Sequence, residues 1–118
     1  MKRQPFITLL ALLGAVTAAR VLVAMKTDLS PDEAYYFAWA LKPAAGYLDH
    51  PPMVAWLIHA ATRAFGGGEL AVRLPAIVCG CLTPLFLYFT AVEAGAAGSW
   101  ALVAAAAAVL TPLASAGA

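Results

Sequence analysis

Charged side chains are scarce in this chain. Only 11% of its 118 residues are Asp, Glu, Lys or Arg, whereas about a quarter of residues are charged in a typical soluble domain. Hydrophobic residues make up 64%, a share that indicates a membrane protein. The net charge of +1 excludes a dense basic surface, so the composition predicts no nucleic-acid binding.

Cysteine is also rare, and its placement argues against a disulfide or a metal pair. The two cysteines, Cys79 and Cys81, lie in an apolar run at a spacing that puts them on different sides of a helix. We interpret both as packing or lipid-facing residues. The sequence predicts no metal site and no required cofactor, and a divalent cation held by carboxylates stays an open alternative.

Three stretches are apolar enough to cross a membrane, at residues 5–25, 74–91 and 97–115. A helix that crosses the hydrocarbon core needs about 20 mostly apolar residues. The first stretch contains Arg20 near its end, where the side chain extends toward the interface. The third is mostly alanine and is expected to pack against other helices. The predicted fold class is therefore all-α, with polytopic transmembrane helices.

The first stretch has one alternative interpretation, a cleaved secretory signal, because Lys2 and Arg3 precede it. No clear cleavage site follows, and the apolar run continues to Met25, so we interpret it as an uncleaved anchor. The same basic residues favour a cytoplasmic N-terminus and place residues 26–73 on the outer side of the membrane.

The connection 26–73 contains nine of the thirteen charged residues, so chemistry is expected there. A helix is predicted at 31–41, where Ser30 and Glu33 fit a capping box. A second is predicted at 52–65, with an apolar stripe of Val54, Leu57, Ile58, Ala61 and Phe65. This helix would be about 21 Å long, too short to cross a core of about 30 Å. Two short interfacial helices are therefore expected.

Asp32 and Glu33 are the first candidates for chemistry, because a carboxylate accepts a proton from an attacking hydroxyl or holds a cation. Both also fit a structural role, since Glu33 is at the third position of the capping box and negative charge is favoured in a first helical turn. Tyr35, Tyr36 and Trp39 follow on the same helical face as Asp32. These rings suit either stacking on a sugar or an aromatic belt at the membrane interface.

A second candidate group is the string from Asp49 to Pro52. A residue that precedes proline is restricted to extended geometry, so His50 is held in a stiff corner beside Asp49. The alternative is that Asp49 or His50 merely caps the helix that follows.

Three strings, in this order, resemble the start of glycosyltransferase family 39 proteins. They are Pro31-Asp32-Glu33-Ala34-Tyr35-Tyr36, then Gly46-Tyr47-Leu48-Asp49-His50-Pro51-Pro52-Met53-Val54-Ala55-Trp56-Leu57, then Val72-Arg73-Leu74-Pro75. That group includes the lipid A aminoarabinose transferases and the protein O-mannosyltransferases, with the GT-C membrane fold. The strings are specific in combination, and the resemblance covers nearly all of the chain.

The resemblance implies a membrane glycosyltransferase that moves a sugar from a polyprenyl-phosphate donor to a hydroxyl of a lipid, protein or glycan. The reaction would be inverting, at the outer face of a bacterial inner membrane and in contact with membrane lipid. Asp32, with Glu33 beside it, would act as the base or orient the acceptor.

Substrate-binding roles follow from the same resemblance for residues of all three strings. The residues concerned are Tyr35, Tyr36, Asp49, His50 and Arg73. The string around Asp49 would shape the cavity opposite Asp32. Arg73, like Arg20 and Lys42, is a candidate partner of the carrier phosphate on account of its charge.

Members of that family have further spans and another acidic motif in a later outer loop. The chain is therefore expected to be an N-terminal fragment that is inactive alone. The main alternative is a non-catalytic three-span membrane subunit whose amphipathic loop docks a partner, in which Asp32 and Asp49 are dispensable caps. A transporter is disfavoured because 74–91 and 97–115 lack ionisable residues.

Overall fold

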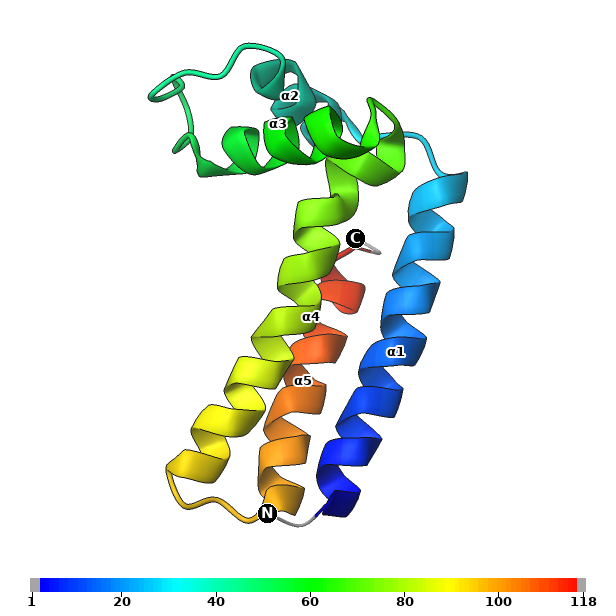
Figure 1. Ribbon diagram of the computed structural model, residues 1–118, viewed down its shortest axis with the longest axis vertical. Coiled ribbons are helices and arrows are strands. Elements are labelled where there is room, and N and C mark those ends of the chain that lie inside the picture. Colours follow the sequence, from blue (N-terminus) through cyan, green and yellow to red (C-terminus); the bar gives the residue numbers. More distant parts are fainter. Residues whose placement is uncertain (1–2, 117–118) are drawn as a thin grey trace. The chain divides into compact units, whose positions relative to one another are not determined.

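The computed structural model describes residues 3–116, with side chains up to Thr111. These residues form five α-helices and no strand. The helices, labelled in Figure 1, are α1 (Arg3–Lys26), α2 (Pro31–Ala40), α3 (Met53–Phe65), α4 (Glu69–Glu93) and α5 (Gly98–Ala116). The predicted all-α fold is confirmed.

Two of the helices, α1 and α4, are long and apolar enough to cross a membrane. Their 24 and 25 residues correspond to about 36–38 Å of helix, more than a hydrocarbon core of about 30 Å. The predicted spans 5–25 and 74–91 lie within them, and α4 begins ahead of its predicted span, at Glu69. In the third apolar helix, α5, the stretch with described side chains is Gly98–Thr111, which is shorter than the apolar stretches of α1 and α4.

The residues divide into two compact units, of which the first comprises Met1–Arg20 and Val78–Ala118. In it α1, α4 and α5 run side by side (Figure 1). The buried core consists of Leu9, Leu13, Tyr88, Ala101, Ala105 and Val109. The α5 members of this core recur every fourth residue, and two of the three are alanine, so the helix backbones approach closely. The alanine-rich helix therefore packs inward, as its composition indicates.

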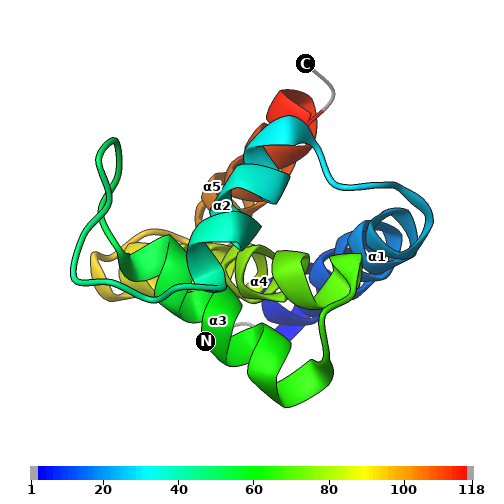
Figure 2. The same ribbon diagram turned by 90° about the horizontal axis from the view of Figure 1, so that it is seen from above.

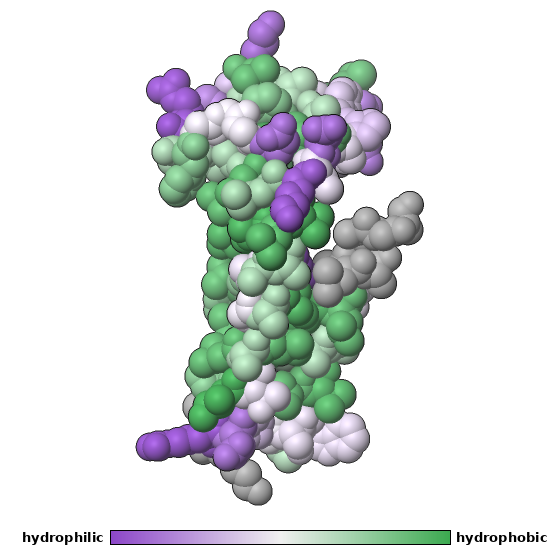
Figure 3. All heavy atoms as spheres, turned by 90° about the vertical axis from the view of Figure 1, so that its right-hand side faces the viewer, coloured by the Kyte–Doolittle hydropathy of each residue, from purple (hydrophilic) through white to green (hydrophobic). Residues whose placement is uncertain are grey.

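The outer surface of this unit is apolar. Figure 3 shows apolar side chains over most of the length of its helices. The large apolar side chains exposed on this surface include Ile7, Phe86, Trp100 and Val103. An apolar surface of this extent is the kind that lipid covers in a membrane protein.

Arg20 does not extend outward as expected from the sequence, but is half-buried, with its guanidinium beside Gly80 and the backbone of Val109. Its Nη2 donates to the carbonyl oxygen of Val109 at 3.4 Å. A Cβ atom added at Gly80 would overlap Nη1 of the same guanidinium. Gly80 therefore provides the space in which the arginine lies.

Replacing Gly80 by Val is expected to destabilise the protein by about 1 kcal/mol, because the end of the flexible Arg20 side chain must shift and its bond to the Val109 carbonyl oxygen is lost. Thermal unfolding of the protein in detergent measures the change. Gly14→Val is the matched control, because Gly14 is also helical and a Cβ there meets nothing within 4 Å. Equal losses in the two variants would contradict this account of Gly80.

The second unit comprises Val21–Ile77, in which α2 packs on α3 (Figure 2). Its core consists of Ala40, Ile58 and Val72, partly covered by Leu29, Tyr36, Phe37 and Val54. His59 of α3 also reaches the end of α2, where its Nδ1 lies 2.8 Å from the carbonyl oxygen of Ala40. Apolar packing and this bond together fix the two short helices.

The apolar stripe predicted for α3 is confirmed in part: Val54, Ile58 and Ala61 pack inward, whereas Leu57 and Phe65 are exposed. The buried face consists of Ala55, Ile58 and Ala61. The exposed apolar face consists of Met53, Trp56 and Leu57, and Phe65 is exposed at the end of the helix. Ala55 is fully buried, whereas the predicted stripe member Leu57 is exposed. The exposed face is the one available to a membrane interface, and that location stays a prediction.

Candidate functional site

The start of α2 is fixed by the predicted capping box. The hydroxyl of Ser30 accepts a bond from the backbone N–H of Glu33 at 3.3 Å. In return, Oε2 of Glu33 accepts the backbone N–H of Ser30 at 2.8 Å. Both bonds are present together with Pro31 in the first turn. This local arrangement aligns Glu33 toward the preceding loop.

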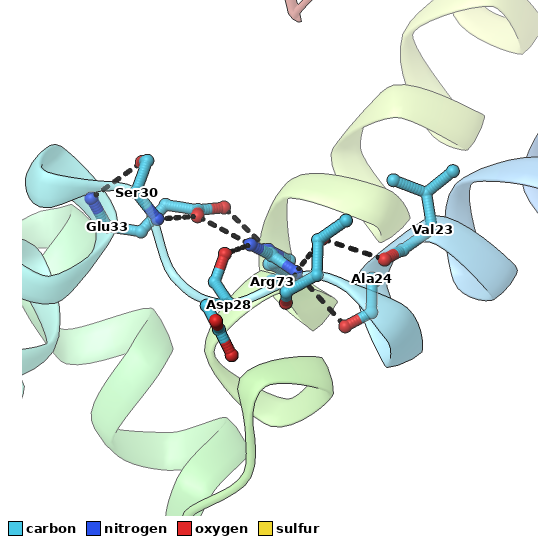
Figure 4. A network of polar contacts seen from close by, with 7 residues as sticks. Val23, Ala24, Asp28, Ser30, Glu33 and Arg73 are labelled. Carbon is cyan, nitrogen blue, oxygen red and sulfur yellow. Dashed lines mark hydrogen bonds and ion pairs between the residues drawn. The ribbon is translucent and has the colours of Figure 1, made fainter.

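A salt bridge between Glu33 and Arg73 connects α2 to the first turns of α4. Nε of Arg73 donates to Oε1 of Glu33 at 2.7 Å, and Nη2 donates to Oε2 at 2.8 Å. Figure 4 shows the guanidinium between the acidic side chain and the end of α1. This paired geometry is the strong form of an arginine–carboxylate contact.

The remaining donors of Arg73 bind backbone and hydroxyl oxygens near the end of α1. Nη1 donates to the carbonyl oxygens of Ala24 and Thr27 and also lies 2.9 Å from the Thr27 hydroxyl. Nη2 also donates to the carbonyl oxygen of Asp28 at 2.7 Å. The last carbonyl oxygens of a helix have no hydrogen-bond donor within it, and Arg73 provides the donor for that of Ala24. With these contacts, all five N–H donors of the guanidinium have acceptors.

These contacts change the roles expected for Glu33 and Arg73. Hydrogen bonding to Arg73 lowers the pKa of Glu33 from 4.5 to about 2, so the carboxylate stays ionised but is already occupied. Arg73 has no free donor for a carrier phosphate. The geometry supports a structural role for both residues, and gives no support to the substrate contact expected of Arg73.

Asp32 differs from Glu33 in its exposure and in its contacts. It occupies the first turn of α2 and is exposed. Among the side chains that the structure describes, none forms a hydrogen bond or ion pair with its carboxylate. Asp32 is therefore the member of the acidic pair that is free to bind a substrate or accept a proton.

The second candidate group reaches α2 through Tyr35. The Tyr35 hydroxyl donates to Oδ2 of Asp49 at 3.2 Å. Desolvation, followed by the bond to Asp49, raises the pKa of Tyr35 above its ordinary value, so the phenol keeps its proton. The structure thus brings together Tyr35 and Asp49, which are 14 positions apart in the sequence.

Five rings gather around this contact and form the aromatic cluster of Tyr35, Tyr36, Trp39, Tyr47 and His50. Trp39 is at its centre. Its ring centroid lies 4.4 Å from that of Tyr35 and 4.8 Å from that of Tyr47, with which it stacks. His50 lies 5.5 Å from Trp39 and 5.8 Å from Tyr36. The candidate residues Tyr35, Tyr36, Asp49 and His50 therefore share one region.

Packing within the aromatic cluster limits the number of rings that are available to a sugar. Trp39 is half-buried, with the ring of Tyr47 on one face. Tyr35 is the most exposed of the α2 rings, at 47%. The expected stacking surface is thus reduced from three rings to Tyr35, because the other rings of α2 pack against the loop.

The start of α3 excludes the capping role considered for Asp49 and His50. The N-cap of α3 is Pro52, and no side chain bonds to the cap. Both Asp49 and His50 are exposed. A purely structural explanation through helix capping therefore does not account for this pair.

The part of the chain that the structure describes contains no group of three His, Cys, Asp or Glu side chains placed to hold a metal ion. Cys79 is exposed and Cys81 is half-buried, and neither forms a disulfide. The Sγ of Cys81 instead lies 2.9 Å from the Thr17 hydroxyl. Cys81 thus takes part in the packing of the first unit, and Cys79 lies on its exposed surface.

Two site features have no sequence signal strong enough to find them. The bonds of Arg73 to backbone carbonyls join positions more than 40 residues apart. Every residue has a backbone carbonyl, so the sequence does not indicate which of them an arginine binds. Tyr47 appears only as one letter of a motif, yet it organises the loop before Asp49. Contacts of this kind become visible only in three dimensions.

Parts of the chain are similar to known proteins. A family model described as dolichyl-phosphate-mannose-protein mannosyltransferase matches residues 49–118. A stretch of 44 residues is 41% identical to lipid A galacturonosyltransferase RgtD of Rhizobium johnstonii. That stretch covers 37% of this chain and only 9% of the relative. No solved structure matches the chain.

Proposed function

Because the chain belongs to the dolichyl-phosphate-mannose-protein mannosyltransferase family, whose members are GT-C membrane glycosyltransferases, we propose that it carries part of a sugar-transfer site. The donor is a polyprenyl-phosphate-linked sugar, and the acceptor is a hydroxyl of a lipid, protein or glycan. The chain resides in a bacterial inner membrane with its N-terminus in the cytoplasm. Residues 26–73, including α2 and α3, face the outer side.

The observation that carries this proposal is the different environment of two adjacent carboxylates. Glu33 is fixed by Ser30 and Arg73, whereas Asp32 is exposed and forms no hydrogen bond or ion pair with the side chains that the structure describes. A carboxylate without partners at the start of a rigidly held helix is suited to bind an incoming hydroxyl. The aromatic cluster on the same helix offers an exposed ring for the sugar.

In the proposed reaction, the acceptor oxygen attacks the sugar carbon that bears the phosphate. The bond from that carbon to the phosphate oxygen breaks, and the phosphate leaves with the bonding electrons. Asp32 takes the proton that the acceptor hydroxyl loses, so charge and atoms balance. Attack from the side opposite the leaving group inverts the configuration at the carbon.

The leaving phosphate gains negative charge and requires donors. Arg73 does not supply them, because its N–H groups are occupied. Within the described residues, the side chains of Lys42 and His50 form no hydrogen bond or ion pair, and both are exposed. We assign the phosphate contact to these two residues, of which His50 also belongs to the aromatic cluster.

The test is a transfer assay with membranes that contain the protein expressed from its natural gene. Radiolabelled sugar is supplied on a polyprenyl phosphate and, in parallel, as a nucleotide sugar. We expect transfer to an endogenous acceptor from the polyprenyl donor alone. Transfer from neither donor would contradict the enzyme proposal and favour a non-catalytic subunit, and transfer from the nucleotide sugar alone would contradict the donor class.

A further inference from the structure

We propose that Trp39 and Tyr47 are positioning residues, which hold the Asp49–His50 corner against α2 in its reactive arrangement. The inference rests on the proposed function, because it names residues that act through the site described above. Neither side chain needs to touch a substrate. Each acts by fixing the part of the loop that does.

The corner lacks the support that secondary structure normally gives. In the described part of the chain, residues 43–51 form no backbone–backbone hydrogen bond. Asp49 and His50 are exposed and lie outside any helix. A segment with so few backbone bonds opens easily unless side chains hold it. The position of the corner must therefore come from side-chain contacts.

Trp39 provides the largest of these contacts. Its ring touches the rings of Tyr47 and His50 from the loop, with centroids 4.8 and 5.5 Å away. The stack with Tyr47 is nearly parallel, at 14°. Trp39 itself is fixed because it lies on α2, whose start is held by the capping box. The Trp39 ring thus holds the loop in a fixed position against α2.

Tyr47 fixes the loop by a second means, through its hydroxyl. The hydroxyl oxygen lies 3.0 Å from the carbonyl oxygens of both Trp39 and Lys42. It also accepts the backbone N–H of Ala44 at 3.1 Å. One hydroxyl therefore ties the end of α2 to the turn that follows it. This replaces the backbone bonds that the loop lacks.

Trp56 of α3 supports the same turn from the other side. Its indole Nε1 donates to the carbonyl oxygen of Ala44 at 2.9 Å. Ala44 is therefore held through its N–H by Tyr47 and through its carbonyl by Trp56. The chain then reaches Asp49, which accepts from Tyr35. Successive side chains thus define the path from α2 to the corner.

The test uses Tyr47→Phe, which keeps the ring stack and removes only the hydroxyl. Tyr88→Phe is the matched control, because the Tyr88 hydroxyl is buried and has no partner among the described residues. Hydrogen–deuterium exchange of the natural protein in detergent reports on residues 42–50. We expect exchange there to accelerate at least about tenfold in Tyr47→Phe, as local opening becomes easier. The control should leave it unchanged.

Transfer kinetics supply the second readout. We expect Tyr47→Phe to lower kcat about 10- to 100-fold, because small displacements of reacting groups are costly, and to change the donor KM much less. Combined with His50→Ala, Tyr47→Phe should add little further loss, because the contact of the corner with the phosphate is then already absent. Trp39→Phe should behave in the same way in both assays.

Two results would overturn the inference: unchanged exchange at 42–50, or losses that multiply fully in the Tyr47→Phe, His50→Ala double variant. Transfer absent from the unmodified protein would contradict the proposed function instead. The exchange comparison would then still decide whether Tyr47 holds the corner. Failure of the inference and failure of the function are thus distinguishable.

Discussion

Asp32→Asn is expected to lower the rate of sugar transfer by about 10²–10⁴-fold, the range associated with loss of a general base. The amide keeps the size of the side chain but cannot take the proton of the acceptor hydroxyl. Because Asp32 forms no bond within the described structure, folding should change by less than about 1 kcal/mol, the scale of its helix-dipole contribution. The assay is transfer from the polyprenyl donor at equal protein level.

Asp28→Asn is the control for this prediction. Asp28 is likewise exposed, lies close in the sequence, and contributes its backbone carbonyl to Arg73. Its replacement should leave transfer within about twofold of the unmodified protein, as expected of a surface residue outside the site. Undiminished transfer in Asp32→Asn would reduce that residue to a helix cap.

Arg73→Gln is expected to destabilise the second unit by about 2–4 kcal/mol, somewhat less than the 3–5 typical of breaking a fully buried ion pair. The change leaves the Glu33 carboxylate without its partner and removes donors from the carbonyls at the end of α1. The Arg73 side chain is only 14% exposed, so water replaces these contacts poorly. Arg73→Lys should lose less, because the charge stays while the planar fork is lost.

Thermal unfolding in detergent measures these losses, and Arg63→Gln is the matched control. Arg63 is an exposed arginine of α3 with no hydrogen bond or ion pair among the described side chains, so its replacement should shift the midpoint little. Glu33→Gln and Arg73→Gln should couple, so that the double variant loses less than the sum. Additive losses, or an equal loss in Arg63→Gln, would contradict the structural role of the pair.

The pH dependence of stability follows from the same salt bridge. The pKa of Glu33 is lowered from 4.5 to about 2 in the folded protein, so folding favours its ionised form. The resulting stabilisation is complete above about pH 4.5 and is lost as the pH falls toward 2. We expect Glu33→Gln to flatten this part of the profile of the unfolding midpoint, and Asp32→Asn to leave it steep. A profile of Glu33→Gln that matches the unmodified protein would contradict the assignment.

The sequence predicts the local features of this protein well. The apolar stretches identify α1, α4 and α5, because hydropathy acts over a contiguous segment. The capping box of Ser30 and Glu33 is equally local, since both of its bonds lie within one turn. The motif strings identify the family from residues that are read in order, without knowledge of their contacts.

The division of roles between Asp32 and Glu33 is the part that the sequence leaves open. Both acids fit a first helical turn, and only the position of Arg73, 40 residues later, separates them. The same limit applies to Tyr35 and Asp49, whose contact depends on the path of the loop. Ala55 is buried and Leu57 is exposed, although helical periodicity favours Leu57 for the inner side of α3. In the first two cases the deciding partner is distant in the sequence.

The central claim is that Asp32 reacts while Glu33 holds the fold, and paired measurements on their isosteric amides test it most directly. Transfer rate and unfolding midpoint are determined for Asp32→Asn and Glu33→Gln in the same membranes and detergent. The account predicts that Asp32→Asn loses transfer at an unchanged midpoint. It predicts that Glu33→Gln lowers the midpoint and retains transfer at temperatures where it stays folded. The reverse pattern, with transfer abolished in folded Glu33→Gln and retained in Asp32→Asn, would contradict it.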